Sequence, residues 1–161
     1  MSIEFKLDDS CKQKILINRN DVSEDIRSEE CGANASKIAK YKTIRKEIIT
    51  LQRNFLIKPG LIADGRDMGT VIFPEAKVKV FLTAECGIRA KRRYKELKDK
   101  GINVSLAAVL DDMKFRDKQD SERKYGALTM TSDSILVDST NKSVAKVASE
   151  ILDYCKNIYL I

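Results

Sequence analysis

The chain has 161 residues and a net charge of +6, from 30 Lys and Arg against 24 Asp and Glu, and it contains no histidine. The lack of histidine excludes Ser-His-Asp or Cys-His nucleophilic catalysis and histidine-based metal sites within these residues. The positive charge favours anionic partners, such as nucleotides or nucleic acid, and no apolar run approaches the ~18 residues of a membrane span.

The first part of the chain predicts a hairpin followed by helices. Apolar residues alternate over 3–7 and again over 15–17, on either side of a polar turn. This alternation is typical of a β-hairpin. The polar stretch 24–40 is compatible with a helix, and an apolar stripe over 43–56 predicts a longer one, for which Thr43 is the expected N-cap.

Beyond the break at Pro59-Gly60, short apolar strands alternate with helices. The expected elements are strands at Leu61–Asp64 and 78–82, helices at Glu85–Lys100 and after the cap Ser105, a strand at Ser134–Asp138, and a helix from Val144. This order indicates the α/β class. The four cysteines form no C-x-x-C pair, which is typical of reduced thiols, and we expect a cytoplasmic protein.

One motif, Asp64-Gly65-Arg66-Asp67-Met68-Gly69-Thr70, lies at the end of the strand predicted for Leu61–Asp64. In open α/β sheets, ligands bind at the carboxyl ends of the strands. The planar fork of Arg66 suits phosphate. Asp64 could hold Mg²⁺ through water, and Asp67 could accept hydrogen bonds from a sugar or a base. The alternative is a polar turn between two core elements.

Together with Val71-Ile72-Phe73-Pro74, this motif resembles the central signature of bacterial cytidylate (CMP/dCMP) kinases. Residues 116–123 resemble the lid signature of that family, and residues 135–140 resemble its last strand and turn. The resemblance runs from about Ile15 to the C-terminus. It implies a cytoplasmic nucleoside-monophosphate kinase that uses ATP and Mg²⁺ to convert CMP or dCMP to CDP or dCDP.

The family's phosphate loop, G-x-x-x-x-G-K-[ST], is the main departure, because no glycine in this sequence is followed by lysine. The resemblance therefore implies a P-loop kinase sheet without its first two strands, together with a CMP-binding insert and a helical lid. In the family order 2-3-1-4-5, strand 1 lies between the strands expected at Leu61–Asp64 and Lys79–Leu82. We thus expect no hydrogen-bond ladder between these two segments, and parallel pairing of the latter with Ser134–Asp138.

The resemblance also implies a division into four regions. These are a CMP-binding region over 1–57, core strands over 58–88, a lid over 89–127, and a core strand with the C-terminal helix over 128–161. Without the phosphate loop, we expect the chain alone to be inactive, because positioning and charge neutralisation supply most of the rate of phosphoryl transfer.

The candidate site residues follow from the resemblance. Ser36, Arg45 and Asp67 correspond to the residues that recognise cytosine; Arg66 and Arg123 to those on the CMP phosphate; Arg116 and Asp120 to those on the sugar hydroxyls. The expected catalytic residues are Asp64 and three arginines of one helix, namely Arg89, Arg92 and Arg93. Arginine forks near the transferring phosphates could neutralise developing charge.

Each assignment has a structural alternative. Ser36 could bond its own helix backbone, and the arginines at 45, 89, 92 and 93 could form solvated faces. Residues 116, 120 and 123 are spaced as surface ion pairs on one helix. At the level of function, the alternatives are a non-catalytic CMP-binding fragment, half of a split enzyme completed by a separate polypeptide, and, less favoured, a basic nucleic-acid-binding protein.

Overall fold

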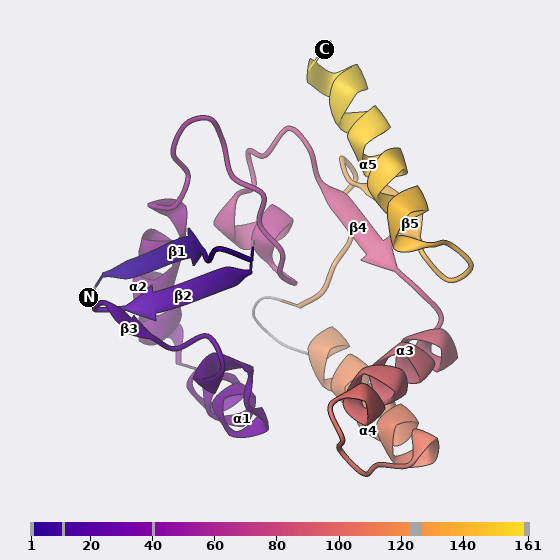
Figure 1. Ribbon diagram of the computed structural model, residues 1–161. Helices are drawn as coiled ribbons and strands as arrows, with labels where there is room; N and C mark the ends of the chain where they lie inside the picture. The colour runs from indigo at the N-terminus through magenta and orange to yellow at the C-terminus, as the bar shows by residue number, and fades with distance from the viewer. Residues whose placement is uncertain (1, 11, 40, 123–126, 160–161) are drawn as a thin grey trace. The chain divides into compact units, whose positions relative to one another are not determined.

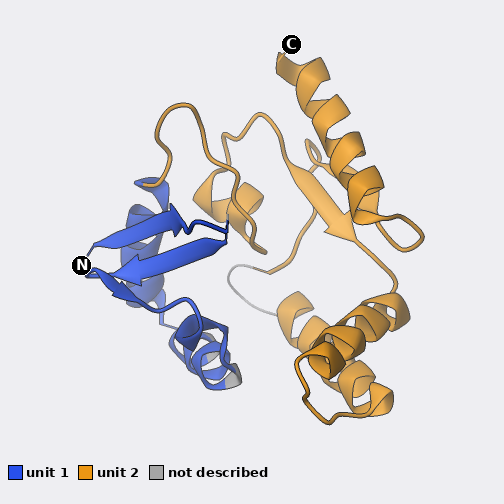
Figure 2. Ribbon diagram, in the orientation of Figure 1, with its two compact units in different colours: residues 1–54 blue, residues 55–161 orange. Residues whose placement is uncertain are grey.

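The computed structural model describes residues 2–10, 12–39, 41–122 and 127–159. The chain divides into two compact units, unit 1 over residues 1–54 and unit 2 over residues 55–161 (Figure 2). Unit 1 contains an antiparallel sheet and two α-helices, whereas unit 2 contains a parallel strand pair and three α-helices (Figure 1). Across the described residues, no helix is both long enough and apolar enough to cross a membrane.

Unit 1 begins with the predicted hairpin. Strand β1 (Ile3–Leu7) pairs antiparallel with β2 (Gln13–Ile17), and the short strand β3 (Asn20–Asp21) joins the other edge of β2. One carboxylate oxygen of Asp8 accepts hydrogen bonds from the backbone N–H groups of Ser10 and Lys12, each at 2.9 Å. This local bonding closes the turn and confirms the hairpin that the alternation predicts.

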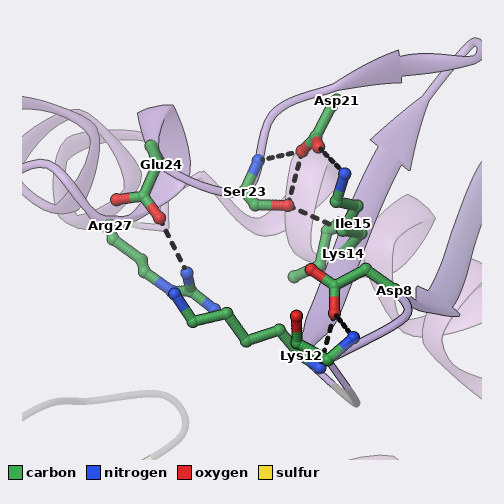
Figure 3. A network of polar contacts seen from close by, with 9 residues as sticks. Asp8, Lys12, Lys14, Ile15, Asp21, Ser23, Glu24 and Arg27 are labelled. Carbon is green, nitrogen blue, oxygen red and sulfur yellow. Dashed lines mark hydrogen bonds and ion pairs between the residues drawn. The ribbon is translucent and has the colours of Figure 1, made fainter.

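A polar network around buried Ser23 fixes the end of this sheet (Figure 3). The Ser23 hydroxyl accepts from the backbone N–H of Ile15 at 2.9 Å and donates to the Asp21 carboxylate at 2.5 Å. Lys14 lies 3.7 Å from the same carboxylate. The hydrogen bonds from the hydroxyl and backbone N–H of Ser23 lower the pKa of Asp21, because they favour its charged form.

Two helices follow in unit 1, after a short 3₁₀ turn (Asp25–Arg27). Helix α1 (Glu29–Ile38) is capped by the Ser28 hydroxyl, which accepts from the backbone N–H of Cys31 at 3.2 Å. Helix α2 (Lys42–Arg53) has Tyr41 in its N-cap position. The prediction that Thr43 caps this helix was wrong, because Thr43 already lies within the first turn.

Unit 2 contains the predicted parallel strand pair. Strand β4 (Val80–Thr83) pairs in parallel with β5 (Ile135–Asp138), with Val80 opposite Ile135. The connection between them contains α3 (Cys86–Asp99) and α4 (Leu106–Ser121), which pack against each other, and α5 (Val144–Tyr159) follows β5. The expected α/β alternation is therefore confirmed.

The ends of α3 and α4 follow the local sequence. After α3, Gly101 has a φ of +75°, a left-handed conformation that suits glycine, and the backbone N–H of Ile102 donates to the Leu97 carbonyl at 2.9 Å. Helix α4 begins as predicted, since the Ser105 hydroxyl accepts from the backbone N–H of Ala108 at 3.1 Å.

The strand predicted at Leu61–Asp64 is not formed. Among the described residues this segment belongs to no sheet, and Ile62 is fully exposed at 101%. A strand needs a hydrogen-bonded neighbour, and β4 pairs only with β5 in the part of the chain that the structure describes. The expectation that Leu61–Asp64 and β4 share no ladder is thus confirmed, although the segment itself is not a strand.

Lys79, which precedes β4, joins three parts of unit 2. It is 8% exposed, and its Nζ donates to the Pro74 carbonyl at 2.6 Å and to the Asp133 carboxylate at 2.6 Å. A Cβ atom placed on Gly69 would lie 3.4 Å from Lys79 Cδ, so the lysine stem passes close to the Asp64–Thr70 motif. The lysine thereby connects the segment after the motif to the loop before β5.

We predict that Lys79→Met lowers the free energy of unfolding by about 1–3 kcal/mol, because the Pro74 carbonyl and the Asp133 carboxylate lose their common donor. Urea unfolding at neutral pH measures the loss. The control is Lys95→Met on the exposed surface of α3, for which about 0.5 kcal/mol or less is expected. Equal losses in the two variants would show that Lys79 does not connect these segments.

Candidate functional site

Two carboxylates on α4 hold arginines from two other elements of unit 2. Asp117 accepts from Arg89 of α3 through both oxygens, at 3.0 and 2.6 Å. Asp120 lies 2.6 Å from Nη2 of Arg66, which belongs to the Asp64–Thr70 motif. Because residues three apart lie on the same side of a helix, α4 places the two ion pairs next to each other.

The Arg89 side chain is held from two directions. Its Nε donates to the Ala84 carbonyl at 2.9 Å, just before α3, while its two terminal nitrogens bind Asp117. The hydrogen bonds from Arg89 lower the pKa of Asp117, and the positive charges of Arg89 and then Arg66 lower it further. The same contact raises the pKa of Arg89. The charge of Arg66 thus acts on both Asp117 and Asp120.

The Arg66–Asp120 pair is unequally exposed to solvent. The Asp120 side chain is 9% exposed, whereas that of Arg66 is 47% exposed. The carboxylate is therefore desolvated, and the guanidinium faces solvent on part of its surface. A partly exposed arginine beside a buried carboxylate can bind an anion and a hydroxyl donor at the same place.

Arg92 contacts the end of β5. Its Nη2 donates to the Ser139 carbonyl at 2.5 Å and its Nη1 to the Ser139 hydroxyl at 3.1 Å. The buried Ser139 hydroxyl in turn donates to the Thr83 carbonyl at the end of β4. These contacts connect α3 to the carboxyl ends of both strands. The prediction that Arg92 lies near the transferring phosphates stays a prediction.

Two other predicted arginines form ion pairs on the surfaces of their own helices. Arg93 lies 3.0 Å from Glu96, and Arg116 lies 2.9 Å from Asp112, one turn away. The Arg116 pair is of the kind that the alternative of surface ion pairs describes, and the Arg93 pair lies on a helix surface, as the alternative of a solvated face describes. Such exposed pairs contribute little to stability, so a ligand could displace them at low cost.

The motif carboxylates differ in their surroundings. Asp64 is exposed, and no hydrogen bond or ion pair joins its side chain to another residue that the structure describes. The Asp67 carbonyl accepts from the backbone N–H groups of Val71 and Ile72 at 2.9 and 3.1 Å, where the π-helix Met68–Ile72 begins. The Asp67 carbonyl therefore stabilises the first turn of this π-helix, which contains the last residues of the motif.

The acidic residues that the structure describes could hold Mg²⁺ only if water and substrate phosphates supplied most of its ligands. Within the described ranges, no three Cys, Asp or Glu residues lie together as a metal cage. Mg²⁺ is usually held by one or two carboxylates together with water and substrate phosphates, and a single exposed carboxylate such as Asp64 suits that role.

The predicted cytosine-reading residues are divided between the two units. Ser36 belongs to α1 and Arg45 to α2 in unit 1, whereas Asp67 belongs to unit 2. The side chain of Ser36 and the whole of Arg123 lie outside the described residues. Their joint role in recognising a base therefore stays a prediction.

Unit 1 also contains a polar cavity of about 360 Å³, which the sequence did not predict. Its lining includes Lys14, Asp21, Glu24 and Arg27, whose charges are already paired, Lys14 with Asp21 and Arg27 with Glu24 (Figure 3). The whole lining contains four acidic and three basic side chains, so its charges largely cancel.

Comparison with known proteins gives the family. The family model described as "Cytidylate kinase" matches residues 1–157. The chain belongs to the cytidylate kinase family. It is similar to the cytidylate kinases of Colwellia psychrerythraea (43% identical, covering 94% of this chain and 67% of the relative), Pseudomonas paraeruginosa (44%, 92% and 65%) and Aeromonas salmonicida (43%, 97% and 67%). The chain thus spans about two thirds of the length of these relatives.

Sequence reasoning missed Asp117, although it lies between two predicted residues, Arg116 and Asp120. Its spacing from Asp120 indicates a shared helix face, which the sequence alone could have shown. Its partner Arg89 lies on a different helix, and no local pattern links the two positions. Only the packing of α3 against α4 brings them together.

We predict that Asp117→Asn lowers the free energy of unfolding at neutral pH by about 0.5–1 kcal/mol, a small value because both partners are partly exposed. The pKa of Asp117 is lower in the folded state than in the unfolded state, so its stabilisation is complete above the unfolded pKa and disappears as the pH falls through the folded pKa. The difference between the wild type and the variant should therefore shrink below about pH 4.

Urea unfolding at pH 7, 5 and 3 measures this dependence. The control is Glu122→Gln, which removes a charge at the end of the same helix, where Lys118 is 4.0 Å away. A difference between the wild type and Asp117→Asn that stays constant down to pH 3 would contradict an ionic origin.

Proposed function

We propose that this chain supplies the CMP-binding and lid parts of a kinase that transfers the γ-phosphoryl group of ATP to CMP or dCMP. The observation that carries the proposal is the Arg66–Asp120 contact of 2.6 Å. In the family pattern these positions correspond to a phosphate contact and a sugar contact. A nucleoside monophosphate offers both groups a few bonds apart, so one ligand could reach both side chains.

In the proposed reaction, a phosphate oxygen of CMP attacks the γ-phosphorus of ATP. The bond from that phosphorus to the β-phosphate oxygen breaks, and ADP leaves with the electron pair. Mg²⁺, when bound to the ATP phosphates, would neutralise part of their charge, with Asp64 as its protein carboxylate. Arg66 and Arg123 would orient the CMP phosphate, and Arg89 would stabilise charge on the transferring group.

The sheet of unit 2 supports the further proposal that a strand and a phosphate loop from outside these 161 residues complete the enzyme. Parallel sheets are normally covered on both faces, yet Leu82 of β4 and Leu136 of β5 are 55% and 57% exposed. We propose that the additional segment pairs with the edge of β4 that faces away from β5, which no strand of the described residues occupies, and that it is either continuous with this chain or part of a separate polypeptide. The helices α3 and α4 would then form the lid.

A non-catalytic CMP-binding fragment is the second candidate. It is favoured by the sequence, in which no glycine is followed by lysine, so no phosphate loop can form within it. A basic nucleic-acid-binding protein is less favoured, because many of the described arginines are engaged in ion pairs, such as Arg66, Arg89 and Arg116. Steep salt dependence of DNA or RNA binding would favour that alternative.

We predict that the 161-residue chain binds CMP or dCMP at least about tenfold more tightly than UMP or AMP, because a site that hydrogen-bonds the cytosine amino group leaves its acceptors unpaired with other bases. Isothermal titration calorimetry with the four nucleotides measures the preference. Arg45→Gln should reduce the preference for CMP over UMP. Equal affinities for CMP, UMP and AMP would contradict the cytosine site.

We also predict that the 161-residue chain transfers phosphate from ATP to CMP at least about 10³-fold more slowly than a full-length cytidylate kinase, because the γ-phosphoryl group is not positioned. A coupled assay of CDP and ADP formation, with a full-length relative in parallel, measures the rate. Rapid turnover by the chain, with contaminating kinase excluded, would show that it positions ATP without a phosphate loop.

A further inference from the structure

The sheet of unit 1 has an open edge along β1. Its strand order is β1-β2-β3, so β1 pairs with β2 on one side, and no strand of the described residues lies on its other side (Figure 1). A further strand can add to such an edge through backbone hydrogen bonds, and natural edges are often protected by charged side chains. Strand β1 carries two charges, Glu4 and Lys6. What this edge binds therefore depends on how the two charges meet a partner strand.

The hydrogen bonds between β1 and β2 determine which backbone groups face the open edge. At one end of the hairpin the backbone N–H of Asn18 donates to the Ser2 carbonyl at 3.0 Å, and at the other end that of Asp8 donates to the Lys12 carbonyl at 2.9 Å. Hydrogen-bonded and non-bonded pairs alternate along an antiparallel ladder, so the even-numbered residues of β1 bond to β2. The odd-numbered residues therefore direct their N–H and C=O groups away from β2.

The side chains of β1 are divided between the two faces of the sheet. Glu4 and Lys6 share one face, where Lys6 Nζ lies 2.9 Å from Glu4 Oε2, and their side chains are 40% and 60% exposed. Ile3 and Leu7 lie on the other face, and Leu7 is 70% exposed. The strand is thus polar on one face and apolar on the other, with an exposed apolar side chain beside its open edge.

We propose that β1 binds a second copy of this chain, and that the two β1 strands pair antiparallel about a two-fold axis at Phe5. Ile3 of one copy then lies opposite Leu7 of the other, and Glu4 lies opposite Lys6. Opposed residues share a face of the sheet, so each charge meets the opposite charge and these apolar side chains meet each other. Ile3 and Leu7 exchange both of their N–H···O bonds across the new ladder.

The two charges select this register over its neighbours. An axis at Glu4 would place the two Glu4 carboxylates opposite each other, and an axis at Lys6 would do the same with the two lysines. Like charges that face each other directly are destabilising. A shift that places Phe5 opposite Glu4 or Lys6 would set apolar side chains against charged ones. The register centred on Phe5 avoids both kinds of mismatch along the whole strand.

The pairing would join two three-stranded sheets into one continuous sheet. It uses the backbone and side chains of unit 1, so it does not depend on kinase activity. Strand β1 has five residues, and a contact between two such strands is smaller than a standard protein–protein interface. The exposed ion pairs contribute more to the choice of register than to affinity. We therefore expect reversible and weak dimerisation.

Sedimentation equilibrium of the 161-residue chain at low ionic strength tests the proposal. The wild type should dimerise with a dissociation constant of about 10–100 μM. Lys6→Glu and Glu4→Lys should each weaken dimerisation at least about tenfold, because the charges that face each other become alike. The control Lys37→Glu, at an exposed position of α1, changes the net charge as Lys6→Glu does and should keep the wild-type dissociation constant.

Mixing the two weakened variants tests the register itself. In a pair of Lys6→Glu with Glu4→Lys, one copy has two negative charges on β1 and the other has two positive charges, so every opposed pair is again attractive. The mixture should form a heterodimer about as tightly as the wild type does. The double variant Glu4→Lys/Lys6→Glu should regain self-association for the same reason.

Hydrogen exchange of the wild type provides a second measurement. The backbone amides of Ile3 and Leu7 should exchange more slowly as the protein concentration rises, because they become bonded across the axis. A wild type that stays monomeric up to about 1 mM overturns the proposal. Dimerisation that neither charge substitution weakens, or a mixture that recovers nothing, also overturns it. If a variant does not fold, exchange at Ile3 and Leu7 decides, and rates that are independent of concentration overturn the proposal.

Discussion

The pairing of two aspartates on α4 with two arginines from other elements is the interaction on which the candidate site depends. Asp117 fixes Arg89 of α3, and Asp120 fixes Arg66 of the motif segment. A single helix thus brings together a loop and a second helix that are far apart in the sequence. The positive and negative charges of the two pairs therefore balance locally.

The position of this cluster depends in turn on a short sheet. Arg92 binds the backbone at the end of β5, and the Ser139 hydroxyl joins the ends of β5 and β4. Lys79 connects the chain after the motif to the loop before β5. Several charged side chains in unit 2 therefore stabilise the loops around the strand ends. Ligands of α/β proteins bind at such strand ends.

The exposed apolar surface of unit 2 is a consequence of how few strands the described residues contribute. Leu82 and Leu136 are more than half exposed, and Ile62 is fully exposed. Two parallel strands with a crossover and one following helix cannot cover both faces of a sheet. Surface of this kind favours association with another strand or chain, which agrees with the family's longer relatives.

The sequence by itself determined the local elements and the family. Alternation predicted the hairpin, and Ser105 predicted the start of α4. The resemblance predicted that Lys79–Leu82 pairs in parallel with Ser134–Asp138, and the structure has this pairing at 80–83 and 135–138. These features depend on neighbours in the chain or on a recognisable signature.

Only the tertiary structure decided which charges meet. The segment at 61–64, before the motif, did not become a strand because strand formation requires a hydrogen-bonded partner. Asp117 contacts Arg89 because α3 packs on α4. Ion pairs between distant elements leave no periodic trace in the sequence, since any arginine can satisfy any nearby carboxylate and packing alone sets which one is near.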